Sequence, residues 1–365
     1  KPEDIGSVFW HSLLFLTALS TVLLIGTQYF GPALLRLFIS SDDVYHAAWL
    51  YLDWRMWGVY FSMVACLFRA FFVGTTQTEV LKYNAVVMVL SNVVLNYVLV
   101  FGHFGFPALG IAGAAIASSI ASGISMLFFI VYTFFKVDYH RFALHRLPKF
   151  KFRLLAKMLN VSLWMMVQSF LSLITWFLFF IAIERLGQRE LAVTNVLRTI
   201  MSFTFMMLSA FASTASTLTS NFLGSGHLTC VRPMVWRVIR MAYFVLIPIW
   251  LLIVIFPVEV MGIFTDEAPI IEGGVAPIRV LALSYIFEVP AFVLFQAISG
   301  TGNTRISFYI EVFSLVVYCC FVYYAVYLQH CSLSVAWVSE ILYALFLFIP
   351  GLLYMRFGRW YRKEL

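Results

Sequence analysis

Ten long apolar runs dominate this chain and limit what it can fold into. They cover roughly residues 7–30, 44–73, 80–101, 108–135, 155–183, 191–222, 235–256, 275–299, 305–328 and 333–355. Each run is near or above the about 20 residues that a helix needs to cross a bilayer. Only 11% of the residues are charged, whereas soluble proteins carry about 25%. The sequence therefore predicts an all-α polytopic membrane protein.

Charge and cysteine content exclude several other classes of protein. A net charge of +7 would suggest a nucleic-acid partner in a soluble chain, but here it indicates basic loops that face anionic lipid. The cysteines form no C-x-x-C pair, so neither a disulfide framework nor a cysteine metal site is expected. No nucleotide-binding pattern is present, which argues against direct drive by ATP.

Basic residues concentrate in three regions. These are Lys136, Arg141, Arg146, Lys149, Lys151, Arg153 and Lys157, then Arg232, Arg237 and Arg240, then Arg356, Arg359, Arg362 and Lys363 in the C-terminal tail. With ten alternating spans, all three regions fall on one side of the membrane, which the positive-inside rule makes cytoplasmic. We therefore expect a multi-pass protein of the bacterial cytoplasmic (inner) membrane, with its basic loops and C-terminus in the cytoplasm.

The chain repeats itself at an offset of 226 positions. Trp10 then aligns with Trp236, Gly74-Thr75 with Gly300-Thr301, and Thr78 with Thr304. Spans one to four thus repeat as spans seven to ten, whereas spans five and six have no partner upstream. A symmetric protein would have six spans in each half. We therefore expect two N-terminal helices to be absent from this chain.

This symmetry predicts the domain organisation. Residues 1–135 form an N-lobe with helices three to six of twelve, and residues 136–154 form a cytoplasmic connector. Residues 155–365 form a C-lobe with helices seven to twelve. Because each repeat has an even number of spans, the copies are parallel repeats about an axis along the membrane normal.

Several motifs resemble the multidrug and toxic compound extrusion (MATE) family of efflux transporters. They are Arg69-Ala70-Phe71-Phe72-Val73-Gly74-Thr75, Asn92 and Asn96, Leu109-Gly110-Ile111, Gly113-Ala114-Ala115-Ile116-Ala117, Leu186-Gly187 and Ser220-Asn221-Phe222-Leu223-Gly224. The resemblance implies twelve helices in two six-helix lobes around a central cavity. Ten of those twelve helices are then present and the first two are missing, and the resemblance is to bacterial members such as NorM and DinF.

Glu288 is a carboxylate inside the apolar run that ends at Gly300. A charge in hydrocarbon is expensive, so it is a functional-site hypothesis by default. Pro290 lacks a backbone N–H and frees the carbonyl of Ile286, and a free carbonyl near an acid suits sodium. The alternative is a neutral, hydrogen-bonded carboxylic acid next to a packing kink.

The resemblance implies the same role for Glu288. Sodium-coupled members carry an acid on the tenth helix twelve residues before the Gly of the following turn, which is the spacing of Glu288 and Gly300. Those members also carry a Glu on the seventh helix, where this chain has Gln168.

Two further acids, Glu311 and Glu340, lie inside predicted C-lobe spans. Glu288, Glu311 and Glu340 are the candidate cation-coupling residues, with Glu288 as a sodium ligand, because a buried carboxyl can bind a cation or exchange a proton. Each of them could instead be a protonated acid bonded to a neighbouring helix. The candidates for the substrate cavity are Gln168, Asn195, Arg198 and Gln296. Arg198 is the cation expected to pair with one of the acids, or to snorkel to the interface.

The predicted function is secondary antiport rather than enzymatic catalysis. We expect the export of amphipathic or cationic compounds in exchange for Na⁺ or H⁺, with no other cofactor. The expected partners are a small-molecule substrate and membrane lipids, with the chain as a monomer. One alternative is a lipid-linked oligosaccharide flippase of the same superfamily, and another is a non-transporting membrane scaffold.

Overall fold

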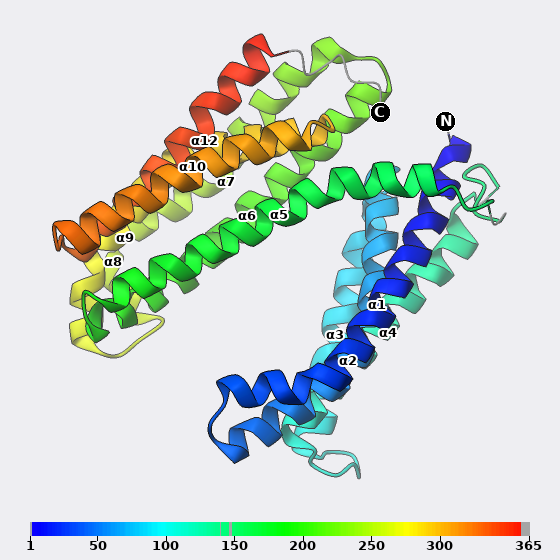
Figure 1. Ribbon diagram of the computed structural model, residues 1–365, viewed down its shortest axis with the longest axis horizontal. Helices are drawn as coiled ribbons and strands as arrows, with labels where there is room; N and C mark the ends of the chain where they lie inside the picture. Colours follow the sequence, from blue (N-terminus) through cyan, green and yellow to red (C-terminus); the bar gives the residue numbers. More distant parts are fainter. Residues whose placement is uncertain (1, 139, 146–147, 359–365) are drawn as a thin grey trace. The chain divides into compact units, whose positions relative to one another are not determined.

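The computed structural model describes residues 2–138, 140–145 and 148–358, and these residues form helices and no strand (Figure 1). Within these ranges ten helical segments are long and apolar enough to cross a membrane. The prediction of an all-α polytopic membrane protein is therefore confirmed. Four basic residues used to predict the orientation, Arg146, Arg359, Arg362 and Lys363, lie outside the described residues.

The chain divides into two compact units, residues 1–156 and 157–365. The helices of the first unit are α1 (Pro2–Phe38), α2 (Asp42–Gly74), α3 (Glu79–Phe101) and α4 (Gly110–Lys136). In this unit α2 packs against α1 and α4, and α4 also packs against α3.

Aromatic packing and small polar residues hold the first unit together. Its core contains the rings of Phe9, Phe68, Phe71, Phe72 and Phe129. Between α3 and α4, Asn84 Nδ2 donates to the carbonyl of Ser125 at 2.9 Å and Ser125 Oγ donates back to Asn84 Oδ1 at 2.8 Å. Paired hydrogen bonds of this kind join helices where apolar surroundings give no hydrophobic force between them.

The connector is attached to the first helix. Trp10 Nε1 donates to the carbonyl of Leu144 at 3.1 Å, and the backbone N–H of Lys151 donates to His11 Nε2 at 2.8 Å. The segment from the end of α4 to the start of the next helix at Phe152 is thus part of the first unit.

The second unit holds the remaining helices. They are α5 (Phe152–Glu184), which begins in the first unit, α6 (Gln188–Gly224), η1 (Leu228–Cys230), α7 (Val231–Ile255), α8 (Pro257–Gly262), α9 (Ala268–Gly300), α10 (Thr304–Val322), the π-helical turn η2 (Tyr323–Leu328), α11 (Leu333–Ala336) and α12 (Val338–Phe357). The central helix is α9, which packs against α6, α7 and α12, while α10 packs against α12.

The helix bounds agree with the predicted repeat. A shift of 226 moves Asp42 to Ala268 and Gly74 to Gly300, which are the two ends of α9. The packing agrees as well, because α2 packs against α4 as α9 packs against α12. The offset therefore relates the same arrangement of helices in the two units.

Two predicted spans differ from the helices in detail, although the last one is confirmed as a single candidate span, Leu333–Phe357. The first predicted span, 7–30, lies within the longer helix α1, which begins at Pro2 and continues past Pro32 to Phe38. The last predicted span, 333–355, is divided at Trp337 into α11 and α12. This division places Glu340 in the first turn of α12, a position at which the helix dipole favours negative charge.

Candidate functional site

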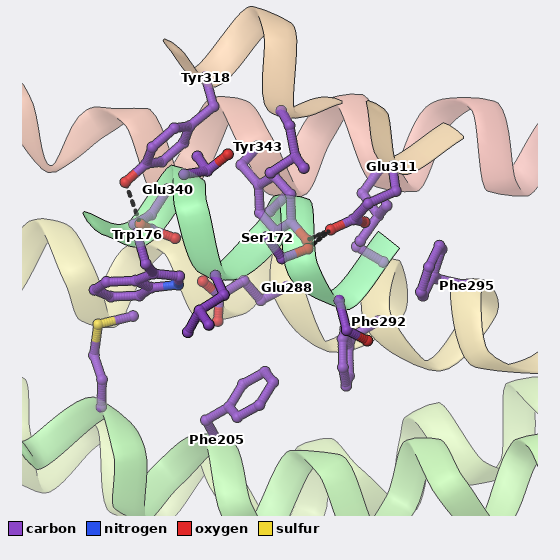
Figure 2. Close-up of a pocket in the computed structure, with 18 of the residues that line it drawn as sticks. Ser172, Trp176, Phe205, Glu288, Phe292, Phe295, Glu311, Tyr318, Glu340 and Tyr343 are labelled. Atoms are coloured by element: carbon purple, nitrogen blue, oxygen red, sulfur yellow. Dashed lines mark hydrogen bonds between the residues drawn. The ribbon is translucent and has the colours of Figure 1, made fainter. Parts of the chain in front are cut away.

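A pocket of about 580 Å³ lies inside the second unit, between α5, α6, α9, α10 and α12 (Figure 2). Its walls carry many aromatic side chains, namely Trp176, Phe177, Phe180, Phe205, Phe292, Phe295, Tyr318 and Tyr343. The three predicted acids, Glu288, Glu311 and Glu340, also line it. The fold thus brings together carboxyl groups from three helices in one largely apolar space.

The kink residue Pro290 has a specific consequence in α9. The Ile286 carbonyl, which Pro290 deprives of its helical donor, accepts a hydrogen bond from the Tyr243 hydroxyl of α7. The sequence suggested that this carbonyl is free to help bind sodium, but the structure gives it a protein donor. A neighbouring helix has therefore compensated the break in the helical ladder.

Glu288 itself is buried, with 8% of its surface exposed. Ser284, one turn earlier on α9, lies with its Oγ 3.4 Å from Glu288 Oε1 and donates more closely to the Leu281 carbonyl at 2.8 Å. The carboxyl of Glu288 therefore has one long hydrogen bond from its own helix.

Glu311 joins three helices. Ser172 of α5 donates to Glu311 Oε1 at 2.8 Å, and Tyr343 of α12 donates to the same oxygen at 2.9 Å (Figure 2). Its second oxygen, Oε2, is buried and has no hydrogen-bond partner within the described residues. Both donors therefore serve one side of this carboxyl group.

Glu340 has a single donor from another helix. The Tyr318 hydroxyl of α10 donates to Glu340 Oε1 at 3.1 Å, and both residues are buried (Figure 2). Each of the three acids is thus held by at least one hydroxyl group.

The predicted cavity residues divide into two groups. Gln168, Arg198 and Gln296 line the pocket, whereas Asn195 does not and donates to the Leu191 carbonyl of its own helix at 3.1 Å. Asn195 lies on an exposed face of α6, which the residue type alone could not reveal.

Arg198 does not form the ion pair with an acid that the sequence suggested as one of two alternatives. Its guanidinium lies 5.2 Å from the centre of the Phe180 ring, and in the described part of the chain it forms no ion pair with an acid. A cation over an aromatic face is stabilised by the electrons of the ring, so Phe180 takes the place of a carboxylate partner.

Four hydroxyl groups at the site were missed by the sequence reasoning: those of Ser172, Ser284, Tyr318 and Tyr343. All four lie in apolar runs, where Tyr is typical of packing and Ser of close helix contact. The one signal in the sequence was the spacing of Ser284, which is four residues before Glu288 and so lies on the same helix face as its acid. Tyr343 is one turn from Glu340 but donates to Glu311 of another helix, which no local spacing could indicate.

The polar groups of the site are mainly carboxyl and hydroxyl groups, whose oxygen atoms can coordinate a cation. Across the described ranges, no group of three or more His, Cys, Asp or Glu side chains is arranged to hold a metal ion. Single carboxyl groups in an aromatic pocket can hold a monovalent cation, an organic cation or a proton. A helical membrane bundle with such a pocket is typical of secondary transporters.

Comparison with known proteins agrees with this class. The family model MatE matches residues 1–98 and 162–324. A probable multidrug resistance protein NorM from Thermotoga maritima is 23% identical over 365 residues, which cover 99% of this chain and 78% of that protein. The corresponding NorM from Photorhabdus laumondii is 23% identical over 259 residues, which cover 70% of this chain and 56% of that protein. The matched region thus spans little more than half of the Photorhabdus relative.

A solved structure shows the same fold. It is described as the outward-facing conformation of a multidrug resistance MATE family transporter of the MOP superfamily. It superposes with a TM-score of 0.87 at 18% identity, covering 97% of this chain and 78% of that one. The chain belongs to the MatE family, the MATE transporters that the sequence motifs resemble, and not to a family of enzymes. Its ten candidate spans and bacterial relatives support a multi-pass protein of the inner membrane.

Proposed function

We propose that this protein is a secondary antiporter that exports amphipathic organic cations in exchange for Na⁺ or H⁺ by alternating access. Glu288 and its neighbours Glu311 and Glu340 would carry the coupling. Both named relatives are described as probable multidrug resistance proteins, which favours the export of foreign compounds.

One observation carries the proposal: three buried carboxyl groups share an aromatic pocket of about 580 Å³. Aromatic faces and carboxylates attract the two parts of an amphipathic cation, its apolar body and its charge. A coupling ion that binds the same carboxyl groups would compete with the substrate, and such competition is one way to couple their movement in opposite directions.

The asymmetry of the repeat also supports a functional role for these acids. At the offset of 226, Glu288 is equivalent to Ser62, Glu311 to Ala85 and Glu340 to Ala114. Because the first unit has the same helix arrangement with small residues in these places, the fold does not require the acids.

A lipid-linked oligosaccharide flippase is the less favoured alternative. Its pyrophosphate substrate calls for several cationic side chains around the cavity. The residues that line this pocket include three Glu and one Arg, Arg198, which is the opposite balance of charge.

We further propose that the basic loops face the cytoplasm. Lys136 at the end of α4 and the segment that follows it, with Arg141 and Lys149, would then lie on the same side as Arg232 at the start of α7. Labelling of single introduced cysteines from either side of the membrane would test this orientation.

Transport in liposomes tests the proposed function. The full-length protein would be reconstituted into liposomes loaded with a fluorescent cationic dye, and a sodium or a proton gradient would be imposed separately. We expect one gradient to drive efflux and Glu288→Gln to abolish it. Glu272→Gln is the matched control, because Glu272 is an exposed acid on the same helix, outside the pocket.

Normal gradient-driven efflux by Glu288→Gln would contradict the proposal. An absence of efflux under both gradients, with correctly folded protein, would favour the flippase and would direct the next assay to lipid-linked sugars.

A further inference from the structure

A second, smaller pocket lies at one end of the second unit, where α7 begins and α9 and α12 approach their ends. Its volume is about 290 Å³, and it shares no lining residue with the carboxylate pocket. Two arginines line it, Arg232 of α7 and Arg356 of α12. Among the described residues no acid lines it, so its wall carries two positive charges and no negative one.

Both guanidinium groups have N–H groups to spare. Arg232 donates through Nε to the Met355 carbonyl at 3.0 Å and through a terminal nitrogen to the Arg356 carbonyl at 2.8 Å. A guanidinium has five N–H groups, so three of those on Arg232 remain. In the described part of the chain neither arginine forms an ion pair with an acid. Two such groups at one pocket favour an anion with several oxygen atoms, and phosphate is the anion that arginine matches best.

The rest of the pocket is apolar. Val235, Leu294 and Met355 form a buried floor, and the Trp236 ring stands at the rim, partly exposed. The indole N–H of Trp236 makes no hydrogen bond within the described residues, and Trp is enriched where a membrane protein meets the lipid head groups. Basic and apolar groups side by side suit a ligand that is itself amphipathic.

The first unit shows that the fold does not require this pocket. At the offset of 226, the three floor residues correspond to Phe9, Phe68 and Phe129. The Phe68 ring lies 5.2 Å from that of Phe9 and 6.1 Å from that of Phe129, between ring centres. Three packed rings thus occupy the place at which the second unit has smaller side chains and a cavity.

The rim differs between the two units as well. Arg232 corresponds to Gly6, where a Cβ would overlap the carbonyl of Phe142 in the connector. Trp236 corresponds to Trp10, whose indole donates to the connector carbonyl of Leu144. In the first unit the connector therefore covers this place and uses the indole N–H, whereas the second unit presents basic side chains and an unused donor there.

We propose that this pocket binds the head group of an anionic phospholipid. The phosphate oxygens would accept from Arg232, Arg356 and the Trp236 indole, and the first acyl carbons would contact the apolar floor. The volume lies just below the about 300 Å³ of small ligand pockets, so the site takes the head group while the acyl tails stay in the bilayer. Phe244 follows Trp236 by two turns on the same face of α7 and is exposed, which gives a tail an apolar surface.

The location of the pocket agrees with this ligand. Arg232 and Arg356 belong to the basic regions for which we proposed a cytoplasmic orientation, and anionic lipids concentrate in the cytoplasmic leaflet. The inference adds a lipid site to the proposed function and does not depend on the coupling ion or on the transported compound.

Native mass spectrometry of the full-length protein in detergent tests the site without transport. Phosphatidylglycerol and phosphatidylcholine would be titrated separately at constant ionic strength, and the dissociation constant of the first bound lipid would be measured. We expect phosphatidylglycerol to bind more tightly and Arg356→Gln to weaken it by about fivefold. Arg356→Lys, which keeps the charge, should retain most of the affinity. Arg237→Gln is the matched control, because Arg237 is an exposed arginine of α7 outside the pocket.

Arg356 is the better position to vary, because Arg232 also holds the end of α12. The Arg356 side chain makes no hydrogen bond within the described residues, and Arg232 contacts only its backbone carbonyl. A second variant tests the cavity rather than the charge. Leu294→Phe introduces the ring of the first unit and should weaken phosphatidylglycerol binding with both arginines in place. Leu353→Phe, on an exposed face of α12, is its control.

Several results would overturn the lipid site. They are equal affinity for the two lipids, an equal loss in Arg237→Gln and Arg356→Gln, and unchanged binding by folded Leu294→Phe. Displacement of phosphatidylglycerol by inorganic phosphate at equal concentration would also overturn it, since it would assign the pocket to a soluble anion. The result is separable from the antiport: selective lipid binding in a protein that exports no dye supports the site and contradicts the proposed function.

Discussion

Tyr318 of α10 donates a hydrogen bond of 3.1 Å to Glu340 in the first turn of α12. Both side chains are 5% exposed. The bond therefore joins two neighbouring helices of the pocket wall and holds a carboxyl group that is almost completely buried.

Removing this hydroxyl should destabilise the protein. Tyr318→Phe deprives Glu340 of its donor, and we expect the free energy of unfolding to fall by about 1 to 2 kcal/mol. Tyr324→Phe is the matched control, since Tyr324 is 52% exposed in the adjacent π-helical turn. Unfolding in detergent, followed by circular dichroism, measures both variants. Equal stability of the two would contradict the role of this hydrogen bond.

The donor that compensates Pro290 can be tested with a double-mutant cycle. In Tyr243→Phe the Ile286 carbonyl loses its donor, which should lower stability by about 1 kcal/mol. In Pro290→Ala the backbone N–H returns and can serve the same carbonyl, so the second loss should be smaller. The expected coupling energy is about 0.5 to 1 kcal/mol. Strictly additive effects would show that Tyr243 does not act through this carbonyl.

Equivalent glycines of the repeat should respond differently to substitution. A Cβ at Gly300, the last residue of α9, would overlap the backbone carbonyl of Ser216 on α6, whereas a Cβ at Gly74, the last residue of α2, would meet nothing within 4 Å. Gly300→Ala should therefore destabilise by about 1 to 3 kcal/mol. Gly74→Ala should be neutral or slightly stabilising. Similar melting temperatures for the two variants would contradict the close contact of α6 with α9.

The C-terminal end of α12 should depend on Arg232. Its Nε donates to the Met355 carbonyl at 3.0 Å and a terminal nitrogen donates to the Arg356 carbonyl at 2.8 Å, which caps the last turn of the helix. Arg232→Gln should speed amide hydrogen exchange in that turn by about fivefold to tenfold, the equivalent of about 1 kcal/mol. Arg237→Gln, an exposed neighbour on α7, is the control. Unchanged exchange in Arg232→Gln would rule out the cap.

Much of the fold follows from properties that the sequence carries locally. The length and hydrophobicity of an apolar run decide whether a segment can span a bilayer, so ten spans were predicted and ten are found in the described part of the chain. The equivalence of α2 and α9 was visible for the same reason, because a repeated structure keeps its spacing and its turn residues. Glu288, Glu311 and Glu340 could be singled out because a carboxylate is rare in an apolar run.

The partners of those acids were decided only by the tertiary structure. A helix such as α9, which is apolar on nearly every side, gives no periodic signal of the face it turns toward each neighbour. Helix rotation and crossing place Tyr243 on the Ile286 carbonyl, Arg198 over Phe180, and both Ser172 and Tyr343 on one oxygen of Glu311. A hydrogen bond requires its atoms to approach within about 3 Å, and residues far apart in the chain reach that distance only after the helices have packed.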